Sequence, residues 1–274
     1  MLAAEVEGSV VPAEQAAALA SDRGVTVAEL MGLLVPLAAE RYAISPISGF
    51  RVGAVARGSS GTLYLGANLE LPGTALAFIV HAEQSATANA WLNGEEGLAA
   101  LAVGAAPCGH CRQFLAELTT AASLEVLVAG HEPRLLHELL PESFGPEDLG
   151  VHARLMSPRA NGLKLDSSDP LVLEAFSAAD ASYAPYSRAF AGVALETASG
   201  AVHTGRYAEN AAFNPSLAPL ACALTLRALA GGADDEVTRA VLVEAASRVS
   251  HTGATAEAVR TISAAALEVF RTDT

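Results

Sequence analysis

Basic residues are scarce in this sequence of 274 residues. It holds 16 Lys and Arg against 30 Asp and Glu, which gives a formal net charge of −14 at neutral pH. A protein of this charge repels polyanions through long-range electrostatics. We therefore expect no nucleic acid among its substrates or partners.

Long apolar runs are also missing. Hydrophobic residues make up 51% of the chain, yet no stretch reaches the roughly 20 apolar residues that a membrane-spanning helix needs. Near the N-terminus stand Glu5 and Glu7, where a signal peptide would carry Lys or Arg. We expect a globular cytoplasmic protein with no membrane partner, and its length favours two modest domains over one large one.

Cysteine is the third scarce residue, with only Cys108, Cys111 and Cys222 in the chain. Three thiols cannot all pair with one another, which argues against a disulfide framework. The first two form a C-x-x-C pattern, and in a cytoplasmic protein this pattern indicates metal binding or redox chemistry.

The C-x-x-C belongs to a longer pattern. His81-Ala82-Glu83 is followed, after 23 residues, by Pro107-Cys108-Gly109-His110-Cys111. One imidazole and two thiolates are a usual ligand set for catalytic zinc, because three protein ligands leave a fourth tetrahedral position open. We predict that His81, Cys108 and Cys111 bind one Zn²⁺ per subunit. Glu83 is then the catalytic general acid and base, as in the H-x-E…P-C-x-x-C pattern typical of zinc-dependent nucleobase deaminases.

Two other interpretations of these residues stay open. A structural zinc site is normally closed by four protein ligands, and Glu83 or His110 could supply the fourth only by giving up the open position. A redox protein with a C-x-x-C pair is the second alternative, and bound stoichiometric zinc without thiol turnover would exclude it.

Hydrophobic periodicity and turn residues predict alternating helices and strands. We expect helices over 13–20, 27–41, 78–93 and 108–118, and strands over 50–57, 63–68, 99–103, 124–128 and 151–156. His81 and Pro107 fall at the starts of two of these helices. Free backbone N–H groups at a helix start favour a thiolate, so we expect a lowered pKa for the thiols there.

The chain resembles the cytidine deaminases over nearly all of residues 27–274, specifically the longer bacterial form with two homologous domains. The segments of the first half that carry the resemblance are Ser45-Pro46-Ile47-Ser48-Gly49-Phe50, Gly53-Ala54-Val55-Ala56, Gly66-Ala67-Asn68-Leu69-Glu70, Val80-His81-Ala82-Glu83-Gln84 and Pro107-Cys108-Gly109-His110-Cys111-Arg112-Gln113-Phe114. One departure is Ile47, where relatives commonly have Tyr.

The resemblance implies zinc-dependent hydrolytic deamination of cytidine and deoxycytidine to uridine and deoxyuridine plus ammonia, as in pyrimidine salvage. It implies that the Asn68-Leu69-Glu70 segment binds the ribose and that Phe50 lines the pyrimidine pocket. Glu83 would deliver a proton to ring N3 and return one to the leaving nitrogen. Another pyrimidine nucleoside or nucleotide is the alternative substrate.

An internal repeat links the two halves. A shift of 139 residues without gaps aligns Pro46 with Pro185, Gly66 with Gly205 and Glu70 with Glu209, which indicates a duplicated fold. The same shift aligns the three ligands and the acid/base residue with residues that cannot form a zinc site: Leu220 for His81, Cys222 for Glu83, Ser247 for Cys108 and Ser250 for Cys111. The second copy therefore cannot hold a catalytic zinc.

The expected fold class is α/β, with two homologous three-layer α/β/α deaminase-like domains that contain mixed sheets. The expected bounds are a short helical N-terminal leader over 1–26, the zinc-binding catalytic domain over 27–147, a linker over 148–165 and a degenerate domain without zinc ligands over 166–274. By resemblance, two such chains form a homodimer. The polar loop over 208–215 of the degenerate copy would then help to complete a neighbouring active site.

Overall fold

A computed structural model describes residues 2–273, so Met1 and Thr274, the outermost residues of the expected leader and degenerate domain, lie outside the described part. The helices are α1 (Leu2–Glu5), α2 (Ala13–Arg23), α3 (Val27–Tyr42), α4 (Ala82–Leu92), α5 (Gly109–Leu115), α6 (Leu136–Leu139), α7 (Pro170–Asp180), α8 (Pro219–Leu229) and α9 (Thr252–Ile262). The strands are β1 (Val10–Val11), β2 (Gly53–Gly58), β3 (Leu63–Ala67), β4 (Leu98–Val103), β5 (Glu125–Val128), β6 (Arg134–Leu135), β7 (Ala191–Thr197), β8 (Val202–Arg206), β9 (Val237–Ala245) and β10 (Leu267–Thr272). None of the helices in this range is long and apolar enough to cross a membrane.

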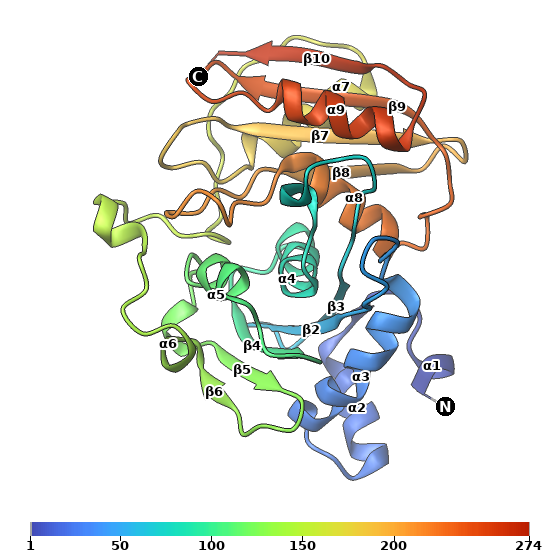
Figure 1. The fold of residues 1–274 in the computed structure, drawn as a ribbon, viewed down its shortest axis with the longest axis vertical. Helices are drawn as coiled ribbons and strands as arrows, with labels where there is room; N and C mark the ends of the chain where they lie inside the picture. The colour runs from blue at the N-terminus through green and yellow to red at the C-terminus, as the bar shows by residue number, and fades with distance from the viewer. Residues whose placement is uncertain (1, 274) are drawn as a thin grey trace.

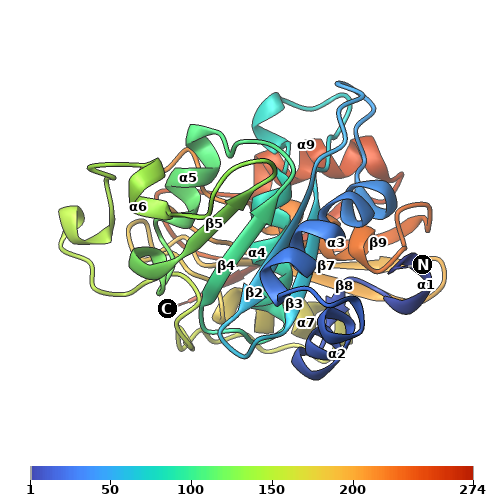
Figure 2. The ribbon, with the colours of Figure 1, turned by 90° about the horizontal axis from the view of Figure 1, so that it is seen from below.

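The first half folds around a six-stranded mixed sheet in the order β1-β3-β2-β4-β5-β6, in which only β4 and β5 pair in parallel. Successive side chains of a strand point to opposite faces, and β2 shows this clearly. Val55 packs into the core beneath α3, whereas Ala54 and Ala56 pack into the core that contains α4. Helices thus cover both faces of the sheet, as Figure 2 shows from below.

Helix α3 shows why the N-terminal part folds onto this sheet. Thr26 accepts a hydrogen bond from the Glu29 N–H, and the Glu29 carboxylate accepts one from the Thr26 N–H, which forms a capping box. Leu30, Leu34 and Ala38 then recur every four residues on one buried face. The predicted helix over 27–41 is confirmed, with one extra residue at its end.

The second half repeats this architecture with a four-stranded mixed sheet in the order β10-β9-β7-β8. Its order matches β5-β4-β2-β3 of the first sheet, and β9 and β10 pair in parallel as β4 and β5 do. Helices α4 and α8 pack against each other between the two sheets (Figure 1). Because their buried side chains join one continuous core, the two α/β/α domains form a single packed unit.

The gapless shift of 139 residues is right for β2, β3 and β4, which it aligns with β7, β8 and β9, and it is wrong for α4 and its counterpart α8. A Cβ on Gly66 would meet Ala82 O and Ala86 N, while a Cβ on Gly205 would meet Pro219 O and Ala223 N. These equivalent contacts relate the helices by 137 residues, so two residues are missing before α8. Ala218 therefore stands where the first copy has His81, and Leu220 where it has Glu83. Neither side chain can bind a metal, so the inference that the copy is degenerate is unchanged.

Two further expectations need correction. The leader over 1–26 is not purely helical, because β1 pairs with β3 and extends the first sheet, and a two-residue strand is too short to give a periodic signal. The strand predicted over 151–156 does not form, although Leu155 makes one isolated bridge with Leu118. The φ of Met156 is 78°, which ends any extended ladder there. The other predicted elements are present with ends within four residues of those expected.

Gly66→Ala is expected to be strongly destabilising. The added Cβ would lie 2.1 Å from the main-chain nitrogen of Ala86, and backbone cannot move aside as a flexible side chain can. We expect the free energy of unfolding to fall by about 3 kcal/mol, the upper end for overpacked positions. Thermal or denaturant unfolding would measure the loss. Gly32→Ala, in α3 with nothing within 4 Å of the new Cβ, is the control and should be neutral or slightly stabilising.

Candidate active site

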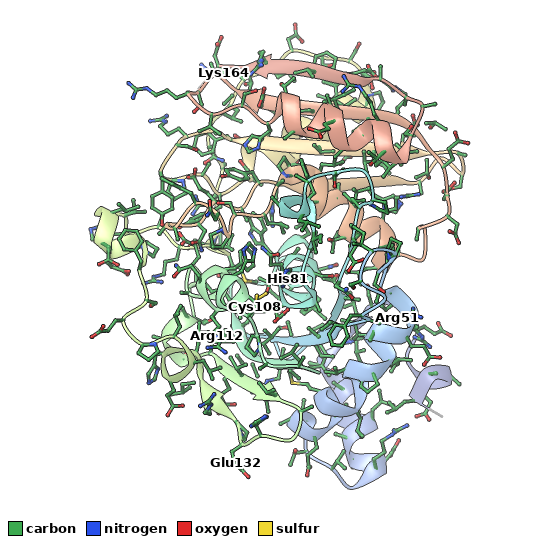
Figure 3. All side chains as sticks on the ribbon, viewed as in Figure 1. Arg51, His81, Cys108, Arg112, Glu132 and Lys164 are labelled. Atoms are coloured by element: carbon green, nitrogen blue, oxygen red, sulfur yellow. The ribbon has the colours of Figure 1, made fainter. Side chains whose placement is uncertain are left out.

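The three predicted ligands lie together where two neighbouring helices begin. His81 is the N-cap residue of α4, and Cys108 is the N-cap residue of α5. Cys111 lies in the first turn of α5 and is fully buried. In Figure 3 the labelled residues His81 and Cys108 lie next to each other, between α4 and α5. The helix predicted over 78–93 in fact begins at Ala82, after a 3-10 turn (Leu76–Phe78), and this late start is what makes His81 a cap residue.

The spacing of the donor atoms fits zinc. Cys108 Sγ lies 3.5 Å from His81 Nδ1 and 3.7 Å from Cys111 Sγ, and the three donor atoms all lie within 4.8 Å of one another. Tetrahedral bonds of about 2.05 Å to nitrogen and 2.3 Å to sulfur imply donor separations of about 3.6 and 3.8 Å. Within residues 2–273, no other group of three or more His, Cys, Asp or Glu side chains has metal-binding spacing. The donor set therefore suits one zinc per chain.

Glu83 lies beside these ligands without joining them. Its side chain is buried in the first turn of α4 and contributes to the wall of the adjoining cavity. Burial first, and then the neighbouring carboxylate of Glu83, raise the pKa of the Cys111 thiol well above its ordinary value. The lowered pKa expected from the helix start is wrong for this thiol, because burial outweighs the backbone N–H groups. Binding of a metal must therefore release a proton, which makes metal affinity depend on pH.

A cavity of about 340 Å³ opens next to the ligands, within the range of small-molecule sites. Its wall combines seven apolar residues with six polar ones: Ser48, Phe50, Val52, Asn68, Glu70, Ile79, His81, Ala82, Glu83, Val103, Ala105, Ala106 and Cys108. Three of the four predicted substrate-binding residues are in this wall. The fourth, Leu69, packs its side chain into the core, while its main chain exchanges two hydrogen bonds with Val80.

Asn68 and Glu70 both hold backbone segments of the cavity wall. The Asn68 carboxamide accepts from Val52 N–H and donates to Phe50 O, each at 2.9 Å, which leaves one N–H free for a ligand. The Glu70 carboxylate accepts from the N–H groups of Ile47 and Ser48, at 2.7 and 3.0 Å, and from the Ser48 hydroxyl.

The charge of Glu70 follows from these contacts. Burial alone would raise its pKa, but the hydrogen bonds from the Ser48 hydroxyl and from the Ser48 and Ile47 N–H groups together hold that pKa below its usual value. Glu70 is therefore ionised at neutral pH and can only accept hydrogen bonds. The turn needs only the main chain of Ile47, whose side chain is half exposed, so the departure from Tyr leaves the turn intact.

From the sequence, His110 was considered only as a possible fourth zinc ligand, and Arg112 had no role. His110 stacks on the His81 ring, with 5.4 Å between ring centroids, and so packs against a ligand. Arg112, labelled in Figure 3, donates to Pro107 O at 2.7 Å and to Leu139 O at 2.8 Å, which fixes the loop that presents Cys108. Their adjacency to Cys111 was the only sequence signal, and it does not specify what they contact.

Comparison with known proteins finds similarity over most of the chain. A sequence model described as the cytidine and deoxycytidylate deaminase zinc-binding region matches residues 26–125, and a second model of the same description matches residues 136–256. The chain is 47% identical over 259 residues to a cytidine deaminase of Shewanella sp. (strain MR-7), covering 94% of this chain and 87% of that one. It is 48% identical over 240 residues to a cytidine deaminase of Vibrio cholerae serotype O1 (strain M66-2), covering 87% and 81%. The crystal structure of cytidine deaminase from Mycobacterium tuberculosis is 31% identical over 43% of this chain and 96% of that chain, with a TM-score of 0.38.

Proposed function

We propose, since this chain belongs to the cytidine and deoxycytidylate deaminase family, that it catalyses the zinc-dependent hydrolytic deamination of cytidine and deoxycytidine to uridine and deoxyuridine, with release of ammonia. One observation carries the proposal. The cluster of His81, Cys108 and Cys111 suits zinc, and the buried carboxylate of Glu83 lies next to it without being part of it. Both border a cavity of about 340 Å³.

His81, Cys108 and Cys111 would hold the metal. When bound, Zn²⁺ supplies Lewis-acid activation of water at neutral pH. Glu83 would accept a proton from the attacking water and deliver it to ring N3 of the pyrimidine. It would then take the proton of the hydroxyl group added at C4 and pass it to the amino group, which leaves as ammonia. Its burial next to the ligand set supports this role, because a carboxylate shielded from solvent keeps the proton within the site.

The remaining polar groups of the wall would position the sugar. We assign ribose binding to Asn68 and Glu70, and contact with the pyrimidine ring to Phe50, whose side chain lies in the wall and is 62% exposed. An ionised Glu70 accepts hydrogen bonds from the hydroxyl groups of a sugar and repels a phosphate group, which is also negative. The substrate should therefore be a free nucleoside rather than a nucleotide.

The rival interpretations have less support. A structural zinc site requires a fourth ligand, but His110 stacks on His81 and does not belong to the ligand cluster. The redox interpretation does not account for the position of His81 Nδ1, 3.5 Å from Cys108 Sγ, at the distance that a shared metal requires.

We also propose that the chain acts in the cytoplasm, in pyrimidine salvage, as a homodimer. Large apolar side chains outside the cavity wall, Leu76 and Phe213 at 70% and 61% exposure, support burial against a second copy. The proposed domains are 27–147 and 166–274 with 148–165 as the linker, which agrees with the start of α7 at Pro170. Sedimentation analysis would test the dimer.

Parallel assays on four substrates test the proposed function. Purified protein with its zinc content determined should release ammonia from cytidine and deoxycytidine, with the accompanying ultraviolet change, and leave CMP and cytosine nearly unreacted. About one zinc per chain is expected, since only one donor cluster has the required spacing within the described residues. Bound zinc with no reaction of any of the four compounds would favour the structural zinc module instead.

A further inference from the structure

A loop of the degenerate domain, residues 208–216, reaches into the catalytic domain of its own chain. We call it the bracing loop. It follows β8 and precedes α8, and inside it the Asn210 N–H donates to Ser216 Oγ at 2.9 Å. Glu209 anchors the start of the loop to a neighbouring turn, because its carboxylate accepts from the N–H groups of Tyr186 and Ser187. These two bonds repeat those that Glu70 makes in the first domain. The loop thus has a fixed shape, and it presents that shape to the two helices that carry the metal ligands.

The first contact is at α4. The Gln84 side chain is buried, and its Nε2 donates to Pro215 O of the bracing loop at 3.1 Å, across 131 residues of sequence. On its other side, Gln84 Oε1 lies 3.4 Å from the main-chain nitrogen of His81, a long hydrogen bond. One carboxamide therefore connects the degenerate domain with the backbone of a proposed zinc ligand, and it directly follows Glu83 in the chain.

The second contact is at α5. Asn210 Nδ2 donates to Gln113 O at 2.9 Å, and Gln113 Nε2 approaches Asn210 Oδ1 at 3.4 Å. Gln113 lies two residues after Cys111 in the same short helix. The bracing loop thus touches both ligand-bearing helices close to their ligands.

The third contact fixes the end of α5. Glu117 is fully buried and comes two residues after the helix. Its carboxylate accepts from Tyr183 OH at 2.6 Å, from Tyr186 OH, and from Ala211 N–H of the bracing loop at 3.0 Å. Separation of the loop from Glu117 would leave a buried carboxyl without these donors, which costs free energy. We therefore expect the end of α5 and the bracing loop to stay together.

We propose that the bracing loop of the degenerate domain sets the relative positions of α4 and α5 within one chain, with Gln84 as the positioning residue that holds the His81 side of the metal site. The zinc donor spacing depends on this relative position because His81 belongs to one helix and both thiols belong to the other. This inference rests on the proposed function only for its activity readout. It gives the degenerate copy a role in its own subunit, beside any role at a neighbouring one.

Three variants test the proposed role of the bracing loop. Gln84→Met removes both hydrogen bonds at similar length, Gln84→Glu keeps the acceptor and loses the donor to Pro215, and Asn210→Ala acts from the loop side without adding charge. Loss of an outer hydrogen-bond partner of a ligand typically costs about 10- to 100-fold in metal affinity or activity. We expect all three variants to release zinc to a chelator with an indicator dye about 10-fold faster. They should also lower kcat for cytidine at least 10-fold, with KM within about twofold.

Arg206→Met is the matched control. Arg206 Nη2 donates to Trp91 O, so it too joins the degenerate domain to α4, but at the helix end away from the metal site. We expect it to lower the thermal unfolding temperature while leaving zinc release and kcat at the wild-type values.

Gln84→Met with wild-type zinc release, or Arg206→Met with release as fast as that of Gln84→Met, would overturn the proposal. Gln84→Glu resembling wild type while Gln84→Met does not would overturn the role of Pro215. If the wild-type protein bound zinc but did not deaminate cytidine, the proposed function would be refuted. The relative rates of zinc release from the variants would still test the role of the bracing loop.

Discussion

Glu83→Ala is expected to keep its zinc and to lose roughly four orders of magnitude in turnover of cytidine, a barrier increase on the order of 5 kcal/mol or more. The effect is large because the same carboxylate would serve both the protonation of ring N3 and the departure of the amino group. Zinc should stay bound because Glu83 is outside the ligand cluster of His81, Cys108 and Cys111. Metal analysis and steady-state kinetics on one preparation would measure both results.

Two further variants sharpen this test. Glu83→Gln keeps the size of the side chain and removes the base, so it should be nearly as inactive as Glu83→Ala. Glu95 is also a buried glutamate of the first domain, but its carboxylate binds the Ser60 and Tyr64 hydroxyls away from the cavity wall. Glu95→Gln should lower stability and keep turnover within a few fold. Near wild-type turnover in Glu83→Ala would refute the assignment of the general acid and base.

The metal site was predictable from sequence because its residues are rare and its geometry is local. Cys108 and Cys111 are one helical turn apart, so any helix that begins at Cys108 brings both thiols to one side. His81 is distant from this pair in the sequence. Its position beside the two thiols could be inferred only because the H-x-E…P-C-x-x-C pattern is typical of a zinc site. In the structure, His81 Nδ1 lies 3.5 Å from Cys108 Sγ, which agrees with that inference.

Contacts between the domains were not predictable in the same way. Gln84 and Pro215 are separated by 131 residues, and nothing in either segment indicates its partner. The gapless repeat alignment was correct through Glu70 and Glu209, whose carboxylates hold equivalent turns, and it failed at the next helix. Segments between a strand and a helix tolerate deletions, and the packing of Gly66 and Gly205 against α4 and α8 reveals the missing two residues.

In the degenerate domain, which has no metal-binding donor cluster among the described residues, a carboxylate holds the equivalent loop. At the end of β9, in the position that leads to the ligand loop in the first copy, the buried carboxylate of Glu244 accepts from Ser250 Oγ at 2.9 Å and from His251 N–H at 2.7 Å. Thr252 Oγ1 donates to the same carboxylate, and Arg271 pairs with it. Burial would raise the pKa of Glu244, but these donors together hold it below its usual value. An ionised carboxylate thus organises the loop that zinc is proposed to organise in the first domain.

Cys111→Ala is expected to abolish stoichiometric zinc binding and, with it, turnover. The side chain is fully buried between α4 and α5, so no water or surface residue can replace the lost ligand without opening the site. The loss should exceed the roughly 10- to 100-fold that removal of an outer-sphere partner costs, since two ligands cannot hold zinc as three do. Zinc analysis after gel filtration, together with the cytidine assay, would measure it.

Cys222→Ala provides the matched control for this experiment. Cys222 is equally buried, but it lies in α8 of the degenerate domain and belongs to no donor cluster among the described residues. Its replacement removes one buried sulfur and should cost about 1 kcal/mol of stability through the small cavity left behind. Zinc content and turnover should stay at wild-type values. If Cys222→Ala lost zinc as Cys111→Ala does, general unfolding would explain both results; if Cys111→Ala kept a full zinc, the proposed ligand set would be wrong.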